Sequence, residues 1–189
     1  MMTAPLPEEN RYQALRLMLY LAIASMIMLF AALTSALLVS KGKGDWQLFT
    51  LPPIFWVNTL VILLSSGSMY LAVRSYRALQ YKPYLNWLLA TTLLGSAFLI
   101  GQLLGWQQLT AGGIRLSGNV SGSYLYVISG AHAVHVAGGV VMLLISLLRS
   151  WRRPLNPARL GGLQLLATYW HFVDLLWLYL MMFLYFNVS

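Results

Sequence analysis

The sequence predicts an all-α, polytopic membrane protein, folded as a bundle of five transmembrane helices. Hydrophobic residues occupy 59% of its 189 positions and charged residues only 8%, whereas soluble domains have about 25% charged residues. The apolar residues fall into five long runs, each with the ~20 residues that a helix needs to cross the hydrocarbon core. A helix satisfies its own backbone hydrogen bonds in lipid. We therefore expect the whole chain, 1–189, to form one membrane domain.

The first expected span covers 15–39. It follows a polar segment that contains two prolines and two glutamates. A secretory signal has an apolar region of about 7–15 residues, and this run is longer, so we expect it to be retained as a helix. The second span, 54–73, starts directly after two prolines, and the third, 84–104, starts directly after Pro83. Proline at these positions predicts a helix boundary.

The last two expected spans cover 124–148 and 163–188. A polar, glycine-rich connection precedes the first of them, and a basic connection with two prolines precedes the second. Both compositions are typical of loops between helices. The sequence therefore predicts five spans joined by short connections.

Basic residues are distributed unevenly between the two sides of the expected bundle. Nine lie on the side of the N-terminus and three on the opposite side. The positive-inside rule therefore predicts that the N-terminus is cytoplasmic and the C-terminus is outside. The nine residues are Arg11, Arg16, Arg74, Arg77, Lys82, Arg149, Arg152, Arg153 and Arg159, and the three are Lys41, Lys43 and Arg115.

The net charge of +8 does not indicate a nucleic-acid-binding protein. The basic residues form short clusters between apolar runs, and no basic face carries the aromatic side chains on which bases stack. The chain has no cysteine. Disulfides, thiolate metal ligands and a cysteine nucleophile are therefore excluded.

Three histidines and one aspartate lie in the last two apolar runs. His132 and His135 are three residues apart, as are His171 and Asp174, so the members of each pair share a helix face. A charged aspartate near the middle of a span costs about 2.5–3.5 kcal/mol on insertion scales. We therefore expect Asp174 to face protein and to pair with His171, or with His132 or His135 across the helix pair.

These four side chains allow two interpretations. Imidazole and carboxylate groups are suitable ligands for zinc or iron, so the cluster could bind a metal ion or haem. Alternatively, the four groups satisfy one another and fix the register of two helices. The second interpretation is favoured because the surrounding residues are small or aromatic, and because no span contains another acid. Trp170, Asp174 and Trp177 share a helix face, so we expect both indoles to pack around the acid.

Small residues predict close contacts between helices. They flank both histidines of the fourth run, and the segment 65–68 of the second run reads SSGS. Serine hydroxyls in such a segment can form hydrogen bonds across helices.

Two stretches resemble a known family. YWHFVDLLWLYL, residues 169–180, closely resembles the last-helix signature of subunit III of haem–copper terminal oxidases, and YLYVISGAHAVHVAGG, residues 124–139, is similar to the preceding helix. Weaker similarities follow in the same order along the chain: RLMLYLAIASMIMLF, WVNTLVILLSS and LGSAFLIGQ. The resemblance thus spans nearly the whole chain and matches the five-span bacterial form of the family.

The chain departs from the family pattern at three positions where the family commonly has an acid. These positions hold Met26, Gly105 and Gln164. The first of the three acids has been linked to proton uptake, so the resemblance does not carry that role over to this chain. Asp174 is the remaining acid in the expected spans.

The resemblance implies an accessory, metal-free subunit III of a respiratory oxygen reductase in the bacterial cytoplasmic membrane. Such a subunit stabilises the catalytic subunit I, contacts the other oxidase subunits and binds lipid. Haems and copper are expected in the partner subunits, because three histidines are fewer than the about six that such a core needs. Arg74, Arg77 and Lys82 are predicted to bind phospholipid headgroups, unless they serve only as topology anchors.

Two other functions are compatible with the sequence. One is a subunit-III-like protein of a nitric oxide or nitrite reductase system. The other is a free-standing, proton-linked membrane protein that uses Asp174.

Overall fold

The computed structural model describes residues 8–42, 46, 48–116, 119–152 and 156–188. These residues form five long α-helices and one short 3-10 helix, which confirms the expected all-α class. Each long helix is apolar and long enough to cross a membrane. The helices are α1 (Glu8–Lys41), α2 (Ile54–Arg77), α3 (Tyr81–Ala111), α4 (Val120–Arg152), η1 (Pro157–Arg159) and α5 (Leu160–Val188).

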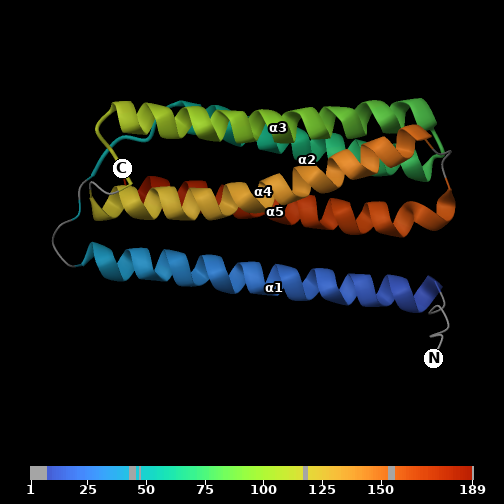
Figure 1. Ribbon diagram of the computed structural model, residues 1–189, viewed down its shortest axis with the longest axis horizontal. Helices are drawn as coiled ribbons and strands as arrows, with labels where there is room; N and C mark the ends of the chain where they lie inside the picture. Colours follow the sequence, from blue (N-terminus) through green and yellow to red (C-terminus); the bar gives the residue numbers. More distant parts are fainter. Residues whose placement is uncertain (1–7, 43–45, 47, 117–118, 153–155, 189) are drawn as a thin grey trace.

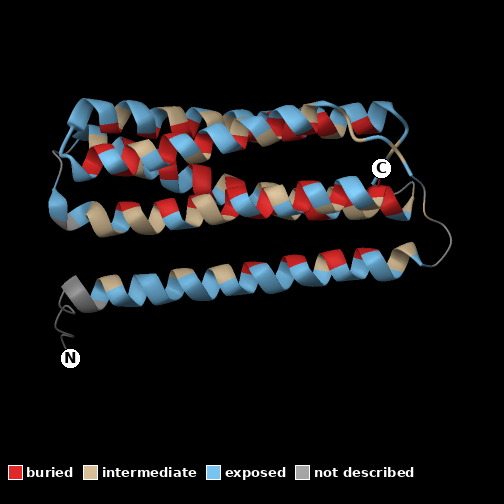
Figure 2. Ribbon diagram, turned by 180° about the vertical axis from the view of Figure 1, so that it is seen from behind, coloured by how far each residue is buried: buried red, intermediate tan, exposed pale blue. Residues whose placement is uncertain are grey.

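Helices α2 to α5 form the body of the bundle, and α1 lies along one side of it, where it packs on α4 and α5 (Figure 1). Buried residues concentrate in α2 to α5 (Figure 2). The buried side chains of α1 belong to its second half: Met26, Phe30, Thr34 and Leu37. Helix α1 therefore docks on the bundle mainly through its second half.

The helices extend a few residues beyond the expected spans. Helix α3 starts at Tyr81, so Pro83 lies inside its first turn, where the missing N–H would have no helical partner in any case. The preceding hairpin needs only residues 78–80, and Leu79 adopts a φ of 55° there. This left-handed conformation is uncommon for leucine, and it lets α2 and α3 pack side by side.

Trp170 of α5 occupies the centre of the bundle. Its side chain is fully buried, and its indole N–H donates a hydrogen bond to Ser65 Oγ of α2 at 3.0 Å. A Cβ atom added at Gly95 of α3 would lie 2.6 Å from the indole ring, and one added at Gly139 of α4 would lie 2.8 Å from it. Both helices therefore approach the ring as closely as glycine allows, and for α4 this agrees with the close contact predicted from the small residues around its histidines.

Candidate functional site

His132 lies in the interior of the bundle. Its side chain is fully buried, and neither ring nitrogen has a hydrogen-bond partner among the described residues. The imidazole is surrounded by aromatic rings: its centroid lies 5.1 Å from that of Trp177, 5.8 Å from that of Phe98 and 6.3 Å from that of Phe30. The structure thus places His132 in an aromatic environment, away from hydrogen-bonding groups.

His135 lies one turn further along α4 and is half-buried. Its Nδ1 atom is 2.7 Å from the carbonyl oxygen of Ala131, so Nδ1 carries the proton and donates it to that oxygen. The ring also packs edge-on against Phe30 of α1, with the centroids 5.7 Å apart. His135 therefore contributes to the contact between α4 and α1.

Asp174 and His171 are connected through a third residue. The Oγ atom of Ser66, on α2, is 2.7 Å from Nδ1 of His171, and it is also close enough to interact with the carboxyl group of Asp174. Asp174 is buried, and neither of its oxygens forms a hydrogen bond of regular geometry with a described residue. Ser66 is thus the hydroxyl that lies between the acid and the imidazole.

The expected hydrogen bond between Asp174 and a histidine is absent among the described residues. The physical reason is that α2 packs against α5 and carries no histidine, so the side chain that it brings to the carboxyl group is the hydroxyl of Ser66. Nor does the described part of the chain bring three His, Asp or Glu side chains within reach of one ion. The geometry therefore gives no support to the metal-binding interpretation.

Trp170 and Trp177, which share a helix face with Asp174, are fully buried. The indole N–H of Trp177 donates to Thr59 Oγ1 at 3.1 Å, in the same way that Trp170 donates to Ser65. The predicted cross-helix role of segment 65–68 is also confirmed, since Ser68 Oγ lies 2.8 Å from Oγ1 of Thr91 on α3. These hydrogen bonds connect α5 to α2 and α2 to α3.

The three positions where the family commonly has acids lie in different environments. Met26 is buried on the face of α1 that contacts the bundle. Gly105 is buried, and a Cβ atom there would lie 3.1 Å from the ring of Phe55. Gln164 is half-buried near the start of α5. The structure therefore has an apolar side chain on α1 where the family has its acid.

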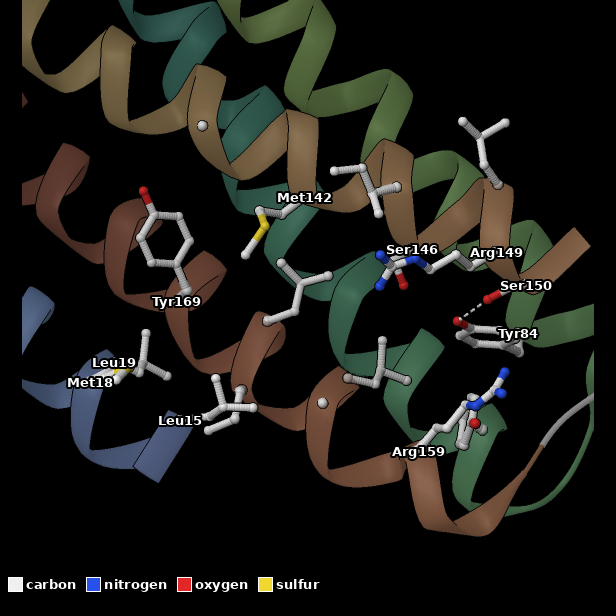
Figure 3. Close-up of a pocket in the computed structure, with 18 of the residues that line it drawn as sticks. Leu15, Met18, Leu19, Tyr84, Met142, Ser146, Arg149, Ser150, Arg159 and Tyr169 are labelled. Carbon is white, nitrogen blue, oxygen red and sulfur yellow. Dashed lines mark hydrogen bonds between the residues drawn. The ribbon is translucent and has the colours of Figure 1, made fainter. Parts of the chain in front are cut away.

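A cleft of about 1430 Å³ separates the first half of α1 from α4 and α5 (Figure 3). Its apolar lining includes Leu15, Leu19 and Met142. Near one end of the cleft, the hydroxyl groups of Tyr84 and Ser150 form a hydrogen bond, with 2.8 Å between the two oxygens. Four arginines from three helix ends also line the cleft: Arg11, Arg149, Arg152 and Arg159. The cleft thus combines a long apolar wall with a cluster of positive charge.

The predicted lipid-binding residues Arg74, Arg77 and Lys82 are exposed at the hairpin between α2 and α3, and they do not line this cleft. From the sequence alone, the four arginines of the cleft are only markers of topology. Their positions at neighbouring helix ends were the signal that could have identified them, because helices that alternate in direction bring those ends together.

Comparison with known proteins identifies the family. Residues 9–189 match the model of the family described as cytochrome c oxidase subunit III. The chain is 29% identical to "Cytochrome c oxidase subunit 3" of Corynebacterium diphtheriae, over 85% of this chain and 82% of the relative. It is 27% identical to the protein of the same name from Bacillus sp. (strain PS3), over 85% and 80% of the two chains.

A third relative is "Probable quinol oxidase subunit 3" of Staphylococcus saprophyticus, which is 28% identical over 80% of this chain and 78% of its own. These relatives are bacterial, and the match covers all five helices described above. The chain therefore belongs to the cytochrome c oxidase subunit III family of the haem–copper oxidases, as a multi-pass bacterial membrane protein.

Proposed function

We propose that this chain is an accessory, metal-free subunit of a respiratory haem–copper oxygen reductase, and that it stabilises the catalytic subunit I and holds lipid. The observation that carries the proposal is the match of residues 9–189 to the subunit III family. The interior supports a structural role, because several of its polar side chains form hydrogen bonds between helices. Examples are the bonds of Trp170 to Ser65 and of Trp177 to Thr59.

The proposed orientation has the N-terminus in the cytoplasm. Among the described residues, eight basic side chains lie at the end of the bundle that holds the start of α1, and two lie at the other end. This asymmetry supports a cytoplasmic location for the first end. The eight are Arg11, Arg16, Arg74, Arg77, Lys82, Arg149, Arg152 and Arg159; the two are Lys41 and Arg115; Lys43 and Arg153 lie outside the described residues.

The cleft beside α1 is the proposed lipid site. Its apolar lining suits acyl chains, and its arginines suit a phosphate group, since basic pockets between transmembrane helices on the cytoplasmic side bind anionic headgroups. The headgroup would lie at Arg149 and Arg159, which both line the cleft (Figure 3). Arg74, Arg77 and Lys82 remain a proposed second contact, at the exposed hairpin.

Purification through an affinity tag on this chain tests its role as an oxidase subunit. From membranes solubilised in mild detergent, we expect the chain to bring down a haem-containing subunit. Optical spectra and mass spectrometry measure the haem and identify the partner. A preparation without haem, or one whose partner reduces nitric oxide rather than oxygen, would contradict the proposal.

Removal of two cleft arginines tests the lipid site. In the Arg149→Gln, Arg159→Gln double variant we expect the tagged complex to lose most of its bound anionic phospholipid, because the headgroup loses two charged partners. Native mass spectrometry measures the lipid per complex. The matched control is the double variant Arg74→Gln, Arg77→Gln, which should keep the lipid of the cleft and lose at most the lipid that contacts the exposed hairpin. The opposite pattern would place the lipid at the hairpin.

A further inference from the structure

His171 lies where α2 and α5 meet at the surface of the bundle. Its side chain is half-buried. Nδ1 is engaged by Ser66, whereas Nε2 forms no hydrogen bond with any residue that the structure describes. Leu175, one turn further along α5, is 66% exposed, and Tyr70, one turn after Ser66 on α2, is 62% exposed. We call Ser66, Tyr70, His171 and Leu175 the His171 patch.

The depth of His171 makes its free nitrogen costly in lipid. His171 is the twelfth residue of α5, so at 1.5 Å per residue it lies about 17 Å from the start of the helix. That depth is inside the hydrocarbon core, which is about 30 Å thick. Polar side chains at such positions normally face protein or a polar cavity. Acyl chains offer Nε2 no hydrogen-bonding group.

The surroundings of His171 favour a helix as the group that covers it. A Cβ atom added at Gly67, the residue after Ser66, would have no other atom within 4 Å. Small residues such as Ser66 and Gly67 let a second helix approach closely, and polar side chains then form hydrogen bonds across the contact. The exposed neighbours Leu175 and Tyr70 supply apolar contact area around the polar centre.

We propose that the His171 patch docks a transmembrane helix of another subunit of the oxidase complex, and that this helix presents an uncharged hydrogen-bonding side chain to Nε2 of His171. This inference rests on the proposed role of the chain as an oxidase subunit. The partner's group is a hydroxyl or a carboxamide, because either can donate or accept. That freedom matters, since Nε2 is a donor or an acceptor according to whether Nδ1 accepts the bond from Ser66 or donates it.

Photo-crosslinking within the tagged complex tests the position of the partner. With a benzophenone amino acid in place of Leu175 or of Tyr70, we expect a covalent adduct with another oxidase subunit. The control position is Leu93 of α3, which is 60% exposed and should give little adduct. Equal adduct from Leu93, an adduct only with a second copy of this chain, or no adduct would overturn the proposal. Haem would still be present in those outcomes, so the proposed function would survive them.

A set of variants tests the bond to Nε2. His171→Leu should release the partner roughly 3- to 15-fold faster during a detergent wash, the range expected for one hydrogen bond inside a membrane. His171→Gln replaces the imidazole by a carboxamide, which can still form a hydrogen bond, and should keep most of the retention. Ser66→Ala removes only the internal bond, so its effect should be smaller than that of His171→Leu. Equal effects of Ser66→Ala and His171→Leu would show an internal role only and would overturn the proposal.

Discussion

Replacement of Trp170 by alanine is expected to destabilise the folded chain by about 3–5 kcal/mol, the usual cost of removing a large buried aromatic side chain. The indole is fully buried and donates a hydrogen bond to Ser65. The backbones at Gly95 and Gly139 lie against its ring, so its removal leaves a cavity between α3, α4 and α5. Neither glycine has a side chain that could fill that cavity.

The Trp170→Ala variant is measured by the amount of chain in membranes and by its thermal aggregation in detergent. We expect most of the chain to be lost, and the remainder to aggregate at a lower temperature than the wild type. The matched control is Trp151→Ala, since Trp151 is 60% exposed near the end of α4. Equal amounts and equal aggregation temperatures for the two variants would show that the stability of the core does not depend on Trp170.

The number and type of the helices could be predicted because the bilayer imposes a simple requirement. A run of apolar residues long enough to cross the hydrocarbon core must fold as a helix, and all five runs do so. The predicted ends of the helices were less accurate than their number and type. The sequence predicts that Pro83 precedes the third span, yet Pro83 lies inside the first turn of α3. A proline at that position costs no hydrogen bond.

The burial of Asp174 could be predicted, but its neighbour could not. An acid in the middle of an apolar helix must avoid lipid, and the structure buries it. Which side chain reaches the acid depends on the register of α2 against α5. Spacing within one helix carries no information about that register, so the sequence predicted a histidine partner where the structure has Ser66.

The cleft could not be predicted either, because it also depends on how the helices pack together. Helix α1 is apolar on most of its surface, so its sequence does not show which face or which half contacts the bundle. The cleft between its first half and α4 and α5 becomes visible only when the helices are placed together (Figure 3). The arginines at three helix ends then appear as one group.

Deletion of this chain is expected to leave a catalytic complex that reduces oxygen at its normal initial rate and then loses activity early. In our account the chain contributes contacts and lipid, whereas the redox groups belong to the partner subunits. The partner complex should therefore retain its haem and its initial rate of oxygen reduction. Its active lifetime should be several-fold shorter, because the lifetime follows the barrier to unfolding, and a loss of about 1 kcal/mol from a barrier raises the rate several-fold.

The most direct test of this account is oxygen turnover per haem, followed over time in complexes purified with and without this chain. We predict equal initial turnover and a faster decline without the chain, together with recovery of the lifetime when wild-type chain is supplied during assembly. A complex that lacks the chain, contains its full complement of haem and shows no initial turnover would contradict the account. That result would assign this chain a direct part in the reaction.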